Sequence, residues 1–260
     1  MSTTKQQLEK SGAAEAVVIV KAAPQIGQKH GETVCCAAID IYGNWLRLYP
    51  VSFQTLDDGK KFGRWDRIKF QWRIPNDDPR PESRRIDQDT LEIVGQLKKN
   101  ERHGFLAGRV VSSLVDERKA GRSFALLKPE ILEFEIQPKP KEKIAKEAAA
   151  IEQLRKQEDL FNSKPIIPRT PCPMEFRYRY RTDDGERTGR CQDWETEATF
   201  FKWRERYGED KAVAEMQKVF GEEYPKKGVL FAMGTHSLYP DTWLMNGIVR
   251  MNELPQGELF

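Results

Sequence analysis

The sequence has 260 residues, and its 43 basic residues nearly balance its 40 acidic ones, which leaves a net charge of +3 at pH 7. This length predicts one large domain or two small ones. The balance of charge excludes a uniformly basic protein, so any site for an anion must come from local segregation of charge. The first ten residues are polar and no apolar run is long enough to cross a bilayer, so we expect a cytoplasmic protein with neither a signal peptide nor a membrane span.

The cysteines and histidines do not form a metal-binding pattern. Four cysteines occur, at positions 35, 36, 172 and 191, without a CxxC pair, and the three histidines lie far apart. We therefore expect reduced, buried thiols and neither a metal nor another cofactor. Glycine-rich phosphate loops, dinucleotide-binding motifs, and the serine-hydrolase and zinc-protease motifs are all missing from the sequence, so the motifs name no reaction.

In chain order, residues 1–14 are expected to be a flexible tail and residues 15–137 an N-terminal α+β domain. Apolar or alternating runs predict strands at 17–20, 33–41, 45–51, 66–74, 90–94 and 131–136. The turn residues 42–44 join two of these strands in a hairpin. The spacing of leucine and valine predicts a helix within 97–119, and the prolines within 76–81 predict irregular backbone there.

Residues 138–171 are expected to form a connector that contains a mostly exposed helix at 141–160, because Ala, Glu, Lys and Gln dominate that segment. A C-terminal domain follows over 172–260. Its predicted order is ββααββ, with strands at 174–181, 187–194, 229–233 and 242–251 and helices at 195–207 and 210–220. The whole order predicts the α+β class: mixed or antiparallel sheets with flanking helices, in two sub-domains joined by the exposed helix.

Two of the predicted strands alternate apolar and basic side chains, so each has one buried face and one cationic face. The cationic faces carry Arg67, Lys69 and Arg73 on the first strand and Arg177, Arg179 and Arg181 on the second. Together with a basic cluster at Lys98, Lys99, Arg102, His103 and Arg109, they favour a surface for nucleic acid. The alternative is that each face is charged to stay soluble and to avoid edge pairing.

The predicted strand 45–51 places Trp45, Arg47 and Tyr49 on one face, opposite Leu46 and Leu48. A row of aromatic, guanidinium and aromatic groups suits a nucleobase, through stacking and cation–π contact. The same pattern also fits two aromatic rings packed under a helix, with the guanidinium paired to a buried carboxylate. Both interpretations remain open from the sequence.

Four further positions bear chemically useful groups. Arg84, in the loop 80–85, suits a bidentate grip on phosphate or a solvated turn. Asp193 is placed to cap the helix that follows, and its alternative role is a carboxylate for a metal or for acid–base work with Glu32. His236 follows a buried strand, where it suits the role of a base. The sequence establishes no catalytic set.

The runs 30–35 (HGETVC) and 45–51 (WLRLYPV) resemble a family of uncharacterised bacterial proteins. So do Asp193-Trp194-Glu195 and the closing pattern that begins at Gly234-Thr235 and ends at Trp243-Leu244. The family has no known activity, so the resemblance implies a bacterial cytoplasmic origin but no mechanism. It singles out Glu32, Arg47, Tyr49, Asp193 and Thr235 as positions to test.

Three hypotheses of function follow. The first is a nucleic-acid-binding protein that uses the basic sheet face and the stacking platform; the resemblance places it in a bacterial defence or mobile-element system. The second is an enzyme that acts on a nucleotide or nucleic acid through Glu32, Asp193 and His236. The third is an assembly subunit that binds a protein partner through the 141–160 helix.

Overall fold

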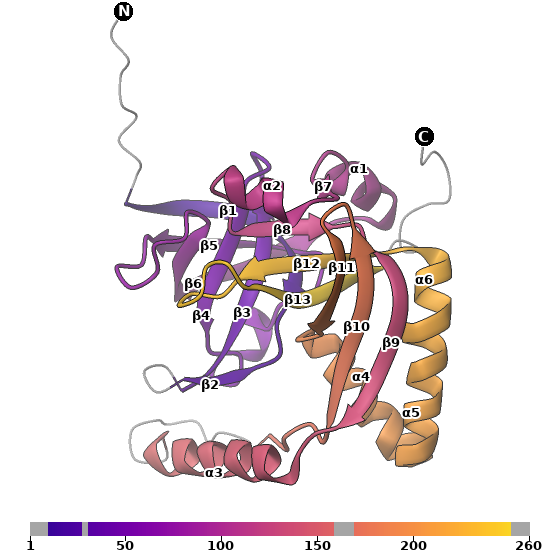
Figure 1. Ribbon diagram of the computed structural model, residues 1–260. Coiled ribbons are helices and arrows are strands. Elements are labelled where there is room, and N and C mark those ends of the chain that lie inside the picture. The colour runs from indigo at the N-terminus through magenta and orange to yellow at the C-terminus, as the bar shows by residue number, and fades with distance from the viewer. Residues whose placement is uncertain (1–9, 28–30, 159–168, 251–260) are drawn as a thin grey trace, which may run out of the picture.

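The computed structural model describes residues 10–27, 31–158 and 169–250. It confirms the α+β class: its strands form three sheets, and helices flank them (Figure 1). The strands are β1 (Ser11–Lys21), β2 (Gln25–Gly27), β3 (Gly31–Asp40), β4 (Trp45–Val51), β5 (Asp66–Arg73), β6 (Ser83–Gln96), β7 (Val110–Val111), β8 (Phe124–Leu127), β9 (Glu130–Pro138), β10 (Met174–Thr182), β11 (Gly185–Arg190), β12 (Val229–Thr235) and β13 (Trp243–Arg250). The α-helices are α1 (Arg102–Leu106), α2 (Leu114–Lys119), α3 (Lys141–Glu158), α4 (Trp194–Tyr207), α5 (Glu209–Lys218) and α6 (Tyr224–Lys227).

The N-terminal strands close into a small barrel. β1 pairs with both β3 and β5, and the ring is completed by the pairs β3–β4, β4–β6 and β6–β5. Only the β4–β6 pair is parallel. Alternate side chains, such as Val18, Leu48 and Ile68, point into the barrel, and Phe62 from the connection between β4 and β5 packs on them.

The middle layer is a four-stranded sheet in the order β13-β12-β8-β7, and it lies against the barrel. Every residue of β12 is buried, as predicted for the apolar run 229–233. Leu230 and Ala232 pack on Ile19 and Ala37 of the barrel, while Phe231 faces the other way. Because apolar layers cover both faces of this sheet, the sequence of β12 shows no alternation of apolar and polar residues.

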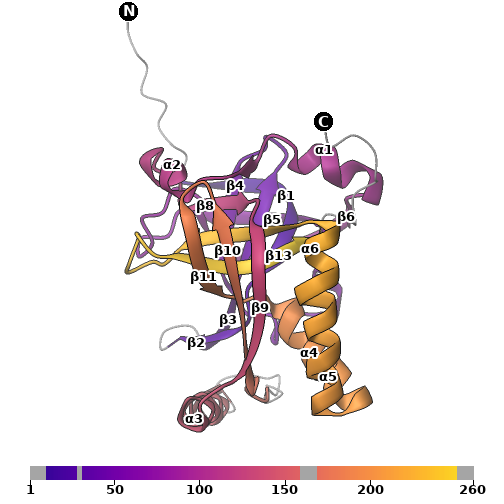
Figure 2. The ribbon, with the colours of Figure 1, turned by 45° about the vertical axis from the view of Figure 1, so that its right-hand side comes forward.

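The outer layer is the three-stranded sheet β11-β10-β9, with α4, α5 and α6 nearby (Figure 2). Phe176 and Tyr178 of β10 point inward, where they pack with Phe200 of α4 and Met216 of α5. The alternation predicted for 174–181 and for 66–74 is confirmed, because the apolar positions are mostly buried while the arginines are half-buried or exposed.

Two local predictions were wrong. Residues 11–14 belong to β1 and not to a tail, and residues 1–9 of the predicted tail lie outside the described residues. The helix predicted within 97–119 is divided into α1 and α2, because Gly108 adopts a φ of +76° and Val110–Val111 then pairs with β8. The backbone therefore turns where the periodicity alone predicted a continuous helix.

The strand pairing does not follow the boundary predicted at residue 137. β8 pairs with β12 and β9 pairs with β10, so strands from 109–137 complete the sheets of the C-terminal part. The helix α3 is mostly exposed, as predicted, but it lies in the connection between β9 and β10, which are neighbours in one sheet. It therefore does not link two separately folded domains.

Gly247 of β13 allows the middle sheet to approach the barrel, and its replacement is expected to separate them. A Cβ atom there would lie 2.7 Å from Cβ and from Cγ1 of Val20, a side chain with few alternative rotamers. We expect Gly247→Ala to lower the free energy of unfolding by about 1–3 kcal/mol in urea titrations. The control is Gly104→Ala in α1, where nothing lies within 4 Å. Equal stability of the two variants would contradict this packing.

Candidate functional site

A cavity of about 440 Å³ opens between the barrel and the hairpin that β12 and β13 form. The barrel contributes residues of β3, β4, the β5–β6 connection and β6, and the C-terminal part contributes residues near the hairpin. Its polar lining consists of Thr33, Cys35, Arg47, Tyr49, Asp77, Asp78, Arg80, Arg85, Gln192, Thr235, His236, Ser237 and Asn246. The volume lies within the range of sites for small molecules.

Strand irregularities shape this cavity. The register between β3 and β4 shifts between Val34 and Cys36, and that between β12 and β13 shifts at Ala232 and Met233, which leaves Asn246 without a register partner. Such β-bulges bend a strand and re-aim a side chain. They place Cys35 and Asn246 on the lining of the cavity.

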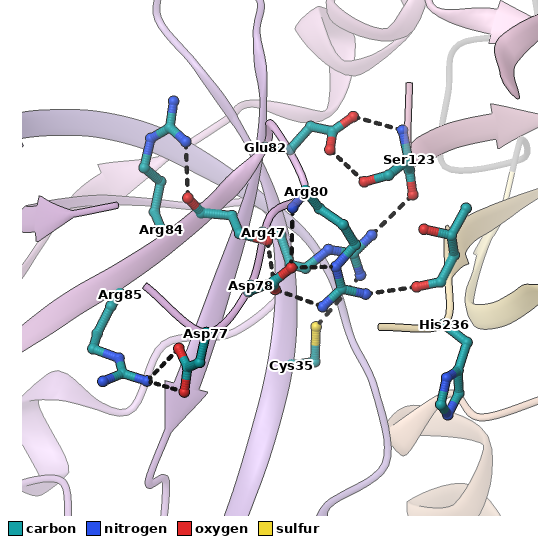
Figure 3. A network of polar contacts seen from close by, with 12 residues as sticks. Cys35, Arg47, Asp77, Asp78, Arg80, Glu82, Arg84, Arg85, Ser123 and His236 are labelled. Atoms are coloured by element: carbon teal, nitrogen blue, oxygen red, sulfur yellow. Dashed lines mark hydrogen bonds and ion pairs between the residues drawn. The ribbon is translucent and has the colours of Figure 1, made fainter. Parts of the chain in front are cut away.

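Arg47 of β4 is the most buried charge in the lining, with 2% of its surface exposed. Its Nη2 donates to the backbone oxygen of Ser123 at 2.9 Å, and its Nη1 lies 3.9 Å from Sγ of Cys35 (Figure 3). The guanidinium also lies 5.5 Å from the ring centroid of Phe124. Among the described residues no carboxylate forms an ion pair with it, and its Nε has no acceptor. A charge buried this way is costly unless an anion compensates it.

The carbonyl that holds Arg47 is itself fixed by Glu82. The Glu82 carboxylate accepts a hydrogen bond from the Ser123 backbone N–H at 2.8 Å and another from the Ser123 hydroxyl (Figure 3). Glu82 therefore fixes Ser123, whose carbonyl accepts from Arg47. Arg47 is thus oriented by a neutral acceptor.

Two buried hydroxyl groups line the same cavity without a partner. Thr33 is 1% exposed and Thr235 is 3% exposed, and neither Oγ1 atom has a hydrogen-bond partner in the described part of the chain. Two such hydroxyl groups on different strands beside one cavity make this cavity the candidate binding site. Gly234 leaves room for this arrangement, since a Cβ there would lie 2.4 Å from Nδ2 of Asn246 and 3.0 Å from Nη1 of Arg47.

The loop between β5 and β6 adds one paired arginine, Arg80, and the start of β6 adds another, Arg85. Arg80 binds the Asp78 carboxylate through Nε and Nη2, at 2.8 and 2.6 Å, and its Nη1 donates to the backbone oxygen of Thr235 at 2.6 Å. Burial would raise the pKa of Asp78, but hydrogen bonds from Arg80 and Ser83 outweigh burial, so this pKa is lowered. Arg85 pairs with Asp77 at 3.1 Å. Three arginines therefore face two aspartates, and the unmatched charge belongs to Arg47.

The predicted stacking row is divided between two environments. Arg47 and Tyr49 line the cavity, but the Trp45 ring packs on Phe124, with 4.6 Å between ring centroids. Arg84 is not part of the lining: its guanidinium lies 4.5 Å from the Trp72 ring centroid and donates to the backbone oxygen of Pro81. Of the predicted row, Arg47 and Tyr49 therefore lie at the cavity, while Trp45 packs on a residue of β8.

The strand arginines lie on two different sheets, and most of them are paired. Glu15 pairs with Arg67 at 2.6 Å and with Lys69 at 3.5 Å, and Arg73 is exposed on the same strand. On β10, Arg177 pairs with Glu175 at 3.0 Å, Arg179 with Glu133 at 3.2 Å, and Arg181 with Glu186 at 2.6 Å. The two strands do not form one continuous sheet. In the 97–119 cluster, Arg102 stacks over Trp65.

The enzyme hypothesis relies on Glu32, Asp193 and His236. Among the described residues, the structure does not bring this set together in one site. Asp193 caps α4, as predicted, by accepting from the Glu195 backbone N–H, and it pairs with Arg64 at 3.4 Å outside the cavity lining. His236 lines the cavity, but its Nδ1 accepts hydrogen bonds from the backbone N–H groups of Leu238 and Tyr239. The side chain of Glu32 lies outside the described residues.

Sequence reasoning missed several residues of the lining. Cys35 and Asn246 reach the cavity at two bulges, Asp78 and Arg80 reach it from an irregular loop, and Thr33 lies next to the first bulge. None of these features leaves a periodic pattern in the sequence. The available signal was the charged loop around Asp77 and Asp78, where carboxylates and arginines alternate at short spacing. The described residues contain no cluster that would hold a metal ion and no helix long and apolar enough to span a membrane.

Fold and site together define a two-part α+β protein with a cationic cavity at the junction of its parts. Residues 13–107 match a family described as a domain of unknown function (DUF8758), and residues 109–260 match a second domain of unknown function (DUF8757). The second match covers more than half of the chain, so the chain belongs to that family. This confirms the resemblance to an uncharacterised family. The cavity lies where the two matched regions meet, and both contribute to its lining.

No curated protein matches the chain. One solved structure, titled "Molecular basis for abrogation of activation of pro-inflammatory cytokines", is similar at 8% identity with a TM-score of 0.31. The similarity covers 74% of this chain and 80% of that chain. A likeness of this size carries no information about function.

Asp193 makes a testable contribution to pH dependence. Burial raises its pKa to about 6, against the opposing effect of Arg64 and with a further increase from Glu195. The folded protein therefore holds this proton more tightly than the unfolded chain, and the stabilisation present at low pH is lost as the pH rises from about 4 to about 6. Asparagine also caps helices, so Asp193→Asn keeps the cap and removes the titration.

We expect the free energy of unfolding of the unsubstituted protein, measured relative to Asp193→Asn, to fall by about 1–3 kcal/mol over that pH range and to be constant above it. Urea titrations at several pH values measure the difference. Parallel curves for the two proteins would contradict a raised pKa at Asp193.

Proposed function

We propose that the protein binds nucleic acid, and that the cavity holds one phosphate-bearing nucleotide unit. The observation that supports this most directly is Arg47: a buried guanidinium without a carboxylate, facing a cavity of about 440 Å³. A phosphate group supplies the negative charge that would pair with the Arg47 guanidinium. It also accepts hydrogen bonds from the unpartnered Thr33 and Thr235 hydroxyls. The phosphate contact proposed here therefore lies in the cavity, whereas the sequence pattern predicted it on the strand arginines, most of which are paired.

The connectivity of the barrel supports the same function. Its five strands follow one another around the ring as β1, β3, β4, β6 and β5, with the third and fifth in chain order parallel. This is the strand order of an OB-fold, whose second and third strands and adjoining loops bind oligonucleotides or oligosaccharides. Here those strands are β3 and β4, which contribute Thr33, Cys35, Arg47 and Tyr49 to the cavity.

Arg47→Met tests the proposal, because methionine fills much of the same space without a charge. We expect it to weaken binding of a single-stranded oligonucleotide about 10- to 100-fold, as loss of a charge-assisted contact does. Fluorescence anisotropy at constant salt measures the affinity. The control is Arg179→Met on β10, which removes the same charge from a paired, exposed arginine and is expected to leave the affinity nearly unchanged.

Far-ultraviolet circular dichroism of Arg47→Met verifies that the variant is folded. If the folded variant binds as tightly as the unsubstituted protein, or if Arg179→Met causes the larger loss, the cavity is not the phosphate site.

The two threonines allow a test in which stability and binding change in opposite directions. Valine keeps the shape of threonine but lacks the hydroxyl, so Thr33→Val and Thr235→Val remove unsatisfied buried groups. Each is expected to raise the free energy of unfolding of the ligand-free protein by about 1 kcal/mol and to weaken oligonucleotide binding several-fold. Thermal unfolding with and without oligonucleotide measures both effects.

Thr90→Val is the matched control for these variants. The Thr90 hydroxyl is already satisfied: it accepts from the Gln71 backbone N–H at 2.9 Å and donates to the Asp87 backbone oxygen at 2.7 Å. Thr90→Val should therefore destabilise the protein and leave binding intact. Destabilisation of the cavity variants by the same amount would contradict a ligand role for their hydroxyls.

A further inference from the structure

A second recess of about 350 Å³ adjoins the cavity, since Ala23 and Gln192 line both. The recess, called here the α3 cleft, lies between helix α3 and the start of α4. Its charged lining consists of Lys139, Lys143, Lys146, Arg169 and Arg190 against Glu147 and Glu197. Among the described residues, five cations thus face two carboxylates, a surplus that the net charge of the whole chain does not reveal.

The ion pairs around the α3 cleft leave this surplus in place. The buried Glu175 carboxylate is shared by three cations: Arg177 at 3.0 Å, Lys143 at 3.4 Å and Arg190 at 3.8 Å. Burial would raise the pKa of Glu175, but the hydrogen bond from Arg177 and the charges of Arg190 and Lys143 outweigh burial and lower it. One carboxylate cannot neutralise three cations, so two positive charges remain for another anion.

Lys139 and Arg169 shape the wall of the α3 cleft. The buried Lys139 pairs with Glu147 of α3 at 2.8 Å and so ties the helix to the end of β9. Arg169 pairs with Glu197 of α4 at 3.2 Å and donates to the backbone oxygen of Pro24 at 3.0 Å. Pro24 lines the α3 cleft next to Ala23, which the cavity also uses. The cleft therefore continues the cavity along the protein surface.

We infer that the ligand is a single strand of nucleic acid that extends from the cavity into the α3 cleft, where the lysines and Arg190 contact its next phosphates. This inference rests on the proposed function. One nucleotide unit occupies the cavity, and the neighbouring backbone phosphates lie along the surplus cations. A duplex keeps its bases paired and stacked, so its nucleotides do not enter a recess of this kind without unpairing. The helix α3 then serves as one wall of a nucleic-acid track.

The test compares ligands of different length and strandedness against two triple variants. The probes are thymidine and uridine monophosphate, single-stranded DNA and RNA of about eight nucleotides, and a DNA duplex of equal length. Lys143→Ala, Lys146→Ala and Arg190→Ala are combined in the cleft variant. Arg67→Ala, Lys69→Ala and Arg73→Ala are combined in the control variant, which has the same change of net charge on the surface of β5.

We expect the unsubstituted protein to bind the oligonucleotides at least about 10-fold more tightly than the monophosphates, because they contact more cations. The cleft variant should lose most of this advantage and keep its affinity for the monophosphates. Its slope of log affinity against log salt should fall by about 2, the value for three lost phosphate contacts with a single strand. The control variant should retain both the affinity and the slope.

The outcomes separate this inference from the proposed function. If monophosphate binding depends on Arg47 and oligonucleotides bind no more tightly than monophosphates, the α3 cleft does not bind the strand. The proposal for the cavity would then be unaffected. Oligonucleotide binding that depends on the cleft residues but not on Arg47 would overturn the cavity and keep the cleft. Duplex binding as tight as single-strand binding would overturn the inference of a single strand, and DNA or RNA preference is read from the same titrations.

Discussion

The burial of Arg47 without a carboxylate is the constraint on which the site depends. Removing a guanidinium from water is costly, and a protein usually offsets that cost with an acid. Here the Glu82 carboxylate binds Ser123, and the guanidinium donates to the backbone carbonyl of Ser123 and lies near Sγ of Cys35. The surrounding strands hold the charge in place, since Phe124 lies against the guanidinium and Gly234 leaves space for it. The fold thus maintains a buried positive charge at the cavity, which is the basis of the proposed phosphate contact.

The middle sheet explains how a small barrel can hold such a charge. An OB-type barrel alone presents its second and third strands to solvent, where a guanidinium would be hydrated. In this chain β12 and β13 cover part of that face, and the apolar layers on both sides of β12 fix the sheet in position. Arg80 connects the two parts directly, through its bonds to Asp78 and to the Thr235 backbone. The cavity is therefore a product of the junction, and neither matched region would form it alone.

The sequence predicted the periodic parts of the fold well, for physical reasons. The alternation in β5 and β10 gave their buried faces correctly, because a sheet with one covered face requires a period of two. It could not give the pairing of β8 with β12 or of β9 with β10, since long-range pairing leaves no local pattern. Arg47 was identified as a candidate for its place between two aromatic residues. The burial of Arg47 under a second sheet could not be predicted in this way, because it depends on contacts with residues far away in the sequence.

The cationic face of β10 and the proposed site differ in how far their cations are paired with carboxylates. On the outer face of β10, Arg179 and Arg181 each have carboxylates within reach, Glu133, Glu130 and Glu186, so their charges are largely compensated in the free protein. A phosphate would have to compete with those acids in full solvent, where screening weakens every pair. Near the cavity and the α3 cleft the ratio is reversed: among the described residues no carboxylate pairs with Arg47, and Glu175 is shared by three cations. In a protein whose total charge is almost balanced, a polyanion is attracted to the place where acids are too few, and counting arginines along the sequence does not locate it.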